Sequence, residues 1–196
     1  MPKIILTTHQ KGGVGKSTLT FNLAQNISNG SKVAVLDFDL QGSLSQIKEM
    51  VTDFEIIPYV GQIDKILELD YDFIFIDTPP YLSNQLSELI AVADLIIVPT
   101  KAGILDLLAI KNTLEMIELA KRTADTMIVF NMIKAKTTLT LDILIGLEEY
   151  NVKIANTHIS DLVSYTRSVL LKGVDKNQTA QRQIDNLTKE ILLKLI

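Results

Sequence analysis

A glycine-rich stretch from Gln10 to Thr18 constrains the fold of this chain more than any other feature. It lies between an apolar run at 4–8 and a segment at 19–27 with helical patterning. A turn of this kind, from a strand into a helix N-terminus, binds phosphate because its backbone N–H groups and the helix dipole favour an anion. An ordinary glycine-containing loop would not need the lysine and the hydroxyl residue that follow in register. We therefore predict a nucleotide-phosphate loop made by Gly12, Gly13, Val14, Gly15, Lys16, Ser17 and Thr18.

The two lysines of this loop have different expected roles. Lys16 matches the lysine that reaches the β- and γ-phosphates of a nucleotide, and the Ser17 hydroxyl matches a Mg²⁺ ligand. Gln10 stands where the standard pattern has glycine, and Lys11 is an additional cation. A second lysine is repelled here unless it has anions to neutralise. Lys11 therefore either helps to bind the triphosphate of its own site or reaches across to another site.

The order of apolar and amphipathic segments predicts an α/β fold. Several expected strands are apolar almost throughout, which is typical of strands covered on both faces. Repeated strand–helix alternation then predicts one doubly wound, mostly parallel sheet of the P-loop NTPase type, with helices on both faces, in a single domain over 1–196. The expected strands span 4–8, 32–38, 54–57, 71–76, 94–99, 126–132 and 152–156. The expected helical segments span 19–27, 43–50, 63–69, 83–92, 104–121, 138–150, 159–171 and 178–195.

Composition narrows the class of protein. The 196 residues include no cysteine, which excludes disulfides and thiolate metal sites and suits a reducing cytoplasm. We find no signal-peptide pattern at the N-terminus and no apolar run long enough to cross a bilayer, so we expect a cytoplasmic protein. The formal net charge of −4 implies that any DNA binding is weak per subunit or needs more than one subunit.

Carboxylates follow two of the expected strands, at the sheet edge where ligands of parallel sheets bind. Asp37 and Asp39 end the second strand and would share one site if that strand persists through Asp39. Such carboxylates hold Mg²⁺ or orient an attacking water, and we assign the second role to Asp39. The alternative is that one of them caps the next helix. Asp77 ends the strand at 71–76, a placement that delivers a carboxylate to the Mg²⁺ side of a nucleotide.

Asn131 closes the strand at 126–132. A side-chain amide offers both a donor and an acceptor, which matches the edge of adenine. The alternative is an asparagine that simply favours the turn after a strand.

These motifs together resemble those of the ParA/MinD family of ATPases. The stretch from Lys11 to Thr18 is similar to the family's deviant Walker A box, 37–42 to its second box and 71–80 to its third. The segments 94–100 and 157–173 also follow the family's order, so the resemblance covers essentially the whole chain. The short chain most resembles the small plasmid-partition ParA proteins, which are ParF-like.

The resemblance implies an ATPase that uses ATP and Mg²⁺, releases ADP and phosphate, and forms a homodimer when ATP binds. It implies that Lys11 reaches the phosphates of the partner subunit, that Asp39 supports hydrolysis and that Asp77 holds a water on Mg²⁺. The adenine-contacting residues implied by the resemblance are Asn131, His158 and Ile159.

The resemblance also implies partners. Partition ATPases of this type bind DNA nonspecifically, associate with the nucleoid and are stimulated by a centromere-binding, ParB-like adaptor protein. Leu40 replaces the usual proline of the second box, and the stretch from 43 to 71 is short for the family, so the identity of the adaptor is not carried over. The candidate DNA-binding cations, which could equally be scattered solvated residues, are Arg167, Lys172, Lys134 and Lys136.

Two alternatives to DNA partition remain. One is an ATPase that positions a non-DNA cargo, and the other is a MinD-like switch on a membrane surface. Leu187, Ile191 and Leu195 lie along one helical face and could anchor the chain to lipid. The segment 187–196 has two lysines and no aromatic residue, so we expect it to pack on the sheet instead.

Overall fold

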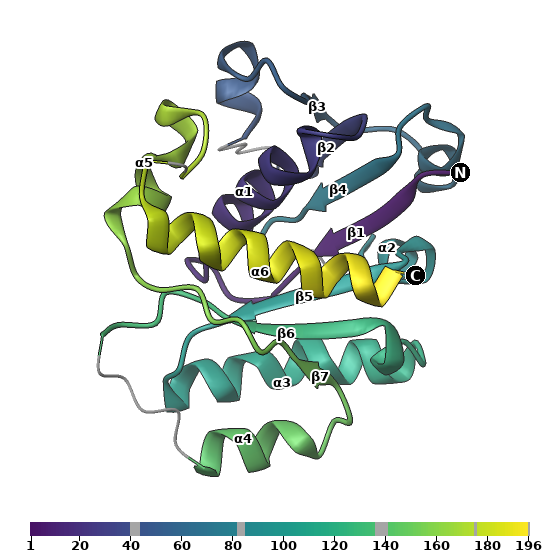
Figure 1. Cartoon of the computed structure of the whole chain (residues 1–196). Coiled ribbons are helices and arrows are strands. Elements are labelled where there is room, and N and C mark those ends of the chain that lie inside the picture. The colour runs from purple at the N-terminus through teal and green to yellow at the C-terminus, as the bar shows by residue number, and fades with distance from the viewer. Residues whose placement is uncertain (40–43, 82–84, 136–140, 175, 196) are drawn as a thin grey trace.

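A seven-stranded parallel sheet forms the centre of the molecule (Figure 1). The computed structural model describes residues 1–39, 44–81, 85–135, 141–174 and 176–195. The strand order is β3-β2-β4-β1-β5-β6-β7, which confirms the expected fold class. The strands are β1 (Lys3–Thr7), β2 (Val33–Asp37), β3 (Glu55–Pro58), β4 (Phe73–Asp77), β5 (Leu95–Thr100), β6 (Thr126–Phe130) and β7 (Lys153–Ile154).

Helices cover both faces of this sheet (Figure 1). The α-helices are α1 (Lys16–Ser28), α2 (Leu86–Val92), α3 (Ile104–Leu119), α4 (Leu141–Glu148), α5 (Val163–Leu171) and α6 (Gln178–Leu195). The segments expected near 43–50 and 63–69 are 3₁₀ helices, η1 (Ser45–Met50) and η2 (Ile63–Glu68), and a short third one is η3 (Thr123–Asp125).

The sheet carries one hydrophobic core on each face. Successive side chains of a strand point to opposite faces, so Ile5 belongs to one core while Ile4 and Leu6 belong to the other. The first core packs against α1, α5 and α6, and the second against α2, α3 and η2. This two-sided burial is the reason that the strands lack polar alternation.

The C-terminal helix belongs to the first core. Leu187 and Ile191 are both 0% exposed and pack with strand residues of the sheet. The apolar face that could have entered a membrane is therefore already covered, and the expected packing on the sheet is confirmed. Among the described residues, none of the helices combines the length and apolarity that a membrane crossing requires.

One expected boundary is wrong, because helix α5 begins at Val163 rather than near Ile159. The Ile159 N–H donates to the carbonyl of Phe130 at 2.9 Å, and the Ile133 N–H donates to the carbonyl of Ile159 at 3.0 Å. These bonds hold the segment before α5 in an extended conformation beside the end of β6. Its apolar pattern is compatible with either state, and the cross-chain hydrogen bonds decide between them.

Candidate nucleotide site

The glycine-rich loop connects β1 to α1 in a conformation that needs glycine at its last position. Gly15 caps the N-terminus of α1 with a φ of +87°, in the left-handed region. A Cβ atom at this position would collide with the side-chain amide of Asn131. That amide donates to the carbonyl of Val14 at 2.8 Å, so a hydrogen bond connects the residue after β6 to the loop.

Lys16 lies beneath the loop. Its ammonium group donates to the carbonyls of His9 at 3.2 Å and of Lys11 at 3.3 Å, and the side chain is almost fully buried. Burial lowers the pKa of Lys16, whereas the carboxylates of Asp77 and Asp39 act in the opposite direction. The loop thus holds a cation at its centre, as the sequence predicts for a phosphate site.

His9 supports the loop as a neutral acceptor. Its Nδ1 accepts the N–H of Lys11 at 2.8 Å. Burial, together with the charges of Lys16 and Lys11, lowers the pKa of His9 to about 4. The imidazole is therefore uncharged near pH 7. Its Nε2 is buried and has no hydrogen-bond partner among the described residues.

Asp77 lies at the end of β4, in register with the last residues of β1 and β2. Its side chain is 1% exposed, and its Oδ1 accepts no hydrogen bond from the described residues. The pKa of Asp77 is raised to about 7, chiefly by burial; a hydrogen bond from Ser17 acts against this rise and the charge of Asp37 adds to it. An orphaned buried carboxylate oxygen beside the loop hydroxyl fits the donor set of Mg²⁺, which prefers oxygen ligands.

The two acids that follow β2 have different surroundings, because the strand ends at Asp37. The carboxylate of Asp37 accepts the N–H of Asp39 at 3.0 Å and the N–H and hydroxyl of Ser45 at 2.8 and 2.6 Å. It therefore accepts hydrogen bonds from the first residue of η1, which is the capping alternative. Asp39 lies beyond the strand and lines a hollow of about 310 Å³ with the glycines of the loop, Thr78 and Pro80. The strand does not persist through Asp39, so the condition under which we expected the two acids to share one site is not met.

Lys11 does not line that hollow. Its ammonium group makes an ion pair of 2.7 Å with Asp106, in the first turn of α3. The side chain of Lys11 is 38% exposed, so it occupies the surface beside the loop. Sequence reasoning did not find Asp106, because the two residues are 95 positions apart.

A second, narrower hollow adjoins the loop on the side of β6. It is lined by Asn131 and Gly15, by Leu19 of α1, and by 160–162 with the start of α5. Ile159 is buried in the core, and His158 is exposed with its ring edge-on to Phe130 at 5.7 Å. Ser160 and Asp161, which line this hollow, directly follow His158 and Ile159 in the chain.

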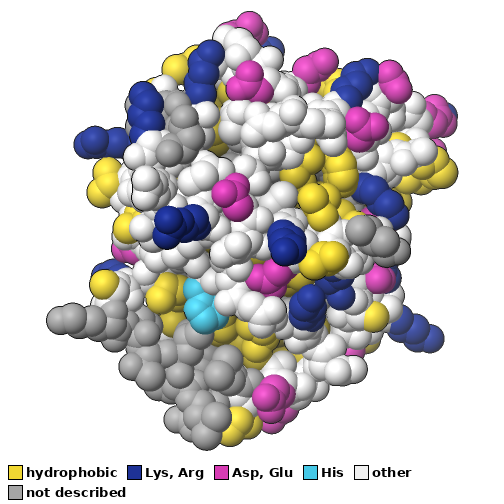
Figure 2. Space-filling view, viewed as in Figure 1, with side chains coloured by type: hydrophobic (Ala, Val, Ile, Leu, Met, Phe, Trp, Pro, Cys, Tyr) yellow, Lys and Arg dark blue, Asp and Glu magenta, His cyan; other side chains and the backbone are white. Residues whose placement is uncertain are grey.

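The candidate DNA-binding cations lie apart from the loop. Arg167 is exposed on α5, Lys134 is exposed after β6, and Lys172 ends α5 with its ammonium group 3.4 Å from the hydroxyl of Thr52. Lys136 lies outside the described residues. On the face shown in Figure 2, basic side chains are interspersed with acidic ones rather than gathered in one patch.

The parallel sheet and the phosphate loop at its carboxyl edge define a P-loop nucleotide-binding protein. Residues 5–192 match the CobQ/CobB/MinD/ParA nucleotide binding domain, called CbiA. The chain therefore belongs to this family, and the sequence-based assignment to ParA/MinD is confirmed.

Three similar proteins show how the family resemblance extends over the chain. "Maintenance of carboxysome distribution protein A" from Halothiobacillus neapolitanus is 26% identical over 202 residues, which cover 93% of each chain. A plasmid partition protein from Borrelia burgdorferi, solved with AMPPNP, superposes with a TM-score of 0.77 at 21% identity and covers 100% of both chains. Apo McdA from Cyanothece superposes with a TM-score of 0.78 at 18% identity and covers 98% of this chain and 100% of its own.

Proposed function

We propose that this chain is a Mg-ATP-dependent ATPase that dimerises on ATP and drives the partition of plasmid or chromosomal DNA, through nonspecific DNA binding and a ParB-like adaptor. The observation that carries the proposal is the pair of loop lysines. Lys16 is buried at the centre of the loop, whereas Lys11 lies at its surface, outside the phosphate hollow. A surface cation beside a phosphate site is available to the triphosphate of a second subunit.

The residues divide the chemistry as follows. Lys16 and the loop N–H groups neutralise the β- and γ-phosphates, and Ser17 and Asp77 hold Mg²⁺, which supplies further charge neutralisation when it is bound. Asp39 lines the hollow above the loop, where it orients the attacking water. Asn131 and the segment 160–162 enclose the base. Dimerisation adds Lys11 from the opposite subunit and completes the positive charge around the reacting phosphate.

Dimerisation and hydrolysis can be measured separately. Sedimentation with AMPPNP and Mg²⁺ should show a dimer that ADP does not support, and phosphate release should depend on protein concentration. Lys11→Ala should abolish the dimer while nucleotide binding persists, and Lys16→Ala should lose nucleotide binding or turnover. Turnover that is independent of concentration and unchanged in Lys11→Ala would contradict the proposal.

DNA binding should require ATP, because the acidic chain needs two subunits to assemble enough cations. Retardation of a nonspecific duplex with ATP should weaken steeply as salt rises. Arg167→Ala should weaken the complex more than Arg182→Ala, a matched change of an exposed arginine on α6. Equal effects of the two changes would remove Arg167 from the DNA site.

A second candidate cargo is a protein body rather than DNA. The relative that is similar over 93% of this chain carries the name of a carboxysome distribution protein, and the Cyanothece structure is that of a McdA. Deletion of the gene in its host separates the two candidates. Loss of plasmid inheritance supports DNA partition, and clustering of a protein body with normal inheritance supports the second candidate.

A further inference from the structure

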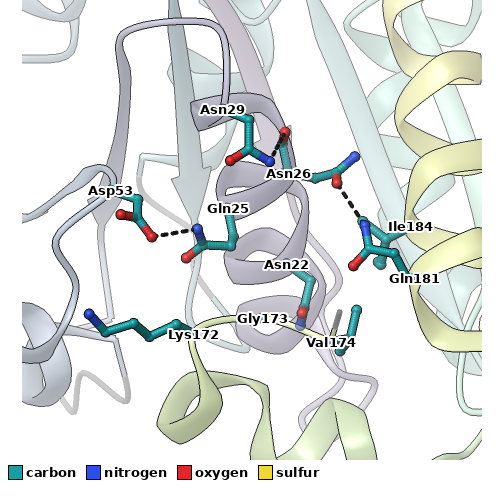
Figure 3. Close-up of a pocket in the computed structure, with 10 residues that line it drawn as sticks. All are labelled: Asn22, Gln25, Asn26, Asn29, Asp53, Lys172, Gly173, Val174, Gln181 and Ile184. Carbon is teal, nitrogen blue, oxygen red and sulfur yellow. Dashed lines mark hydrogen bonds between the residues drawn. The ribbon is translucent and has the colours of Figure 1, made fainter. Parts of the chain in front are cut away.

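A hollow of about 280 Å³ lies apart from the candidate nucleotide site, between α1 and the segment that leads into α6 (Figure 3). It shares no lining residue with the two hollows at the loop. The ATPase function proposed above makes no use of it, and its own ligand has to be sought in the chemistry of its wall.

Side-chain amides dominate that wall. Three of them lie on α1 and a fourth is its C-cap residue, with spacings of three and four residues that place them on one face, and α6 adds a fifth. They are Asn22, Gln25, Asn26, Asn29 and Gln181. The charged side chains that line the hollow, Asp53 and Lys172, are both exposed.

Three of these amide NH₂ groups donate to oxygen acceptors of the protein itself. Asn22 donates to the carbonyl of Thr18 at 2.8 Å and to the hydroxyl of Ser168 at 2.9 Å. Gln25 donates to the carboxylate of Asp53 at 2.8 Å, and Gln181 donates to that of Asp185 at 2.8 Å. Carbonyl and carboxylate oxygens only accept hydrogen bonds, so these contacts fix which end of each amide is nitrogen.

The side-chain oxygens of three amides are consequently left for another molecule, whereas that of Asn26 accepts the amide of Gln181 at 3.0 Å. Among the described residues, no donor contacts the side-chain oxygens of Asn22, Gln25 or Gln181. Asn22, which lines the hollow, is 2% exposed, and its buried Oδ1 has no hydrogen-bond partner among the described residues. A buried acceptor without a donor is unfavourable in the free protein, and a donor that reached it would remove that penalty.

We propose that this hollow binds a guanidinium group, as carried by an arginine side chain or by free arginine. The guanidinium is planar, always charged and has five N–H donors and no acceptor, which complements a wall that offers oxygens. The carboxylate of Asp53 attracts it at the rim, and Lys172 opposes it there. Anions are disfavoured by the same oxygens, so the hollow has the opposite preference to the phosphate loop.

Titration of the full-length, ¹⁵N-labelled chain with N-acetyl-arginine amide tests the proposal. The side-chain amide signals of Gln25 and Gln181 should shift in a saturable way. The uncharged citrulline analogue should bind at least about tenfold more weakly, because charge-assisted hydrogen bonds are the stronger ones. Free arginine distinguishes the sources: equal affinity indicates a side-chain site, and binding of free arginine alone indicates a site for the amino acid.

Substitutions of residues that line the hollow should weaken binding in some cases and strengthen it in others. Gln25→Leu and Gln181→Leu should each weaken binding about fivefold or more, whereas Gln62→Leu, a matched change of an exposed glutamine elsewhere, should not alter it. Lys172→Gln should strengthen binding about twofold or more, because it removes a like charge from the rim. No shift with either arginine compound, equal affinity for citrulline, or weaker binding in Lys172→Gln would overturn the proposal. Phosphate release by each variant should be measured in parallel, so that a failure of the guanidinium proposal can be distinguished from a failure of the ATPase proposal.

Discussion

Replacing Asp106 by asparagine should strengthen the ATP-dependent dimer. In the single chain the carboxylate of Asp106 holds the ammonium group of Lys11 at 2.7 Å. If Lys11 contributes to the site of the opposite subunit, this ion pair must open each time a dimer forms. Asp106→Asn keeps the size of the side chain and removes the charge that opposes this opening.

The size of the effect follows from the exposure of the pair. The side chains are 38% and 13% exposed, so solvent screens the attraction and about 0.5–1 kcal/mol is a reasonable value for one such pair. A dimer opens two of them, which gives about 1–2 kcal/mol in total. The dissociation constant should therefore fall about 5- to 30-fold, since 1.4 kcal/mol corresponds to a factor of ten.

Sedimentation equilibrium with AMPPNP and Mg²⁺ measures this constant. Asp70→Asn is a matched control, because Asp70 pairs with Lys32 at the same 2.7 Å, away from the loop. Asp106 also lies in the first turn of α3, so the change should cost about 0.3–1 kcal/mol of stability, which thermal unfolding would record. A folded Asp106→Asn protein whose dimer is as weak as the original, or weaker, would refute the reasoning.

Three further results should follow from the site. Asp39→Ala should keep the ATP-bound dimer and lose phosphate release; normal turnover would exclude Asp39 from the chemistry. Gly15→Ala should lower the free energy of unfolding by about 2–3 kcal/mol, the sum of a left-handed alanine and the lost Asn131–Val14 hydrogen bond, and unaltered urea melts would contradict this. Between pH 4 and 6.5 the folded, nucleotide-free chain has a neutral His9 (pKa about 4) and a protonated Asp77 (pKa about 7), whereas the unfolded chain has the proton on histidine instead. In this pH range the effects of the two groups on the pH dependence of stability cancel. With His9 alone, in Asp77→Asn, the free energy of unfolding should rise with pH, and with Asp77 alone, in His9→Asn, it should fall, each by up to about 1.4 kcal/mol per pH unit in urea melts. Parallel curves of stability against pH for the original protein and both variants would disprove this assignment.

The fold could be predicted because its main signals are local. Strands such as β4 and β5 are apolar on both faces, and a strand of that kind followed by a helix leaves few arrangements other than a parallel sheet. The start of α5 could not be predicted, because hydrogen bonds to Phe130 and Ile133 decide it, and these residues are distant in sequence.

The candidate site also has a part that the sequence predicts and a part that depends on contacts between distant segments. The loop is contiguous in sequence, and its glycines, Lys16 and Ser17 line one hollow. The role of Asp37 depended on where β2 ends, which an apolar run without alternation does not reveal. The ion pair of Lys11 with Asp106 joins β1–α1 to α3, and such a contact between separate elements leaves no periodic signal in the sequence.

The position of α6 has a consequence for how the chain is made. The side chain of Asn26 on α1 donates to Thr188 on α6, a separation of 162 residues, and both helices belong to one core. At a synthesis rate of about 5–20 residues per second, α1 waits about 8–32 s on the ribosome for the helix that covers it. During that interval Phe21 and Ile27 lack part of their packing, so the nascent chain is a candidate client for chaperones until α6 emerges.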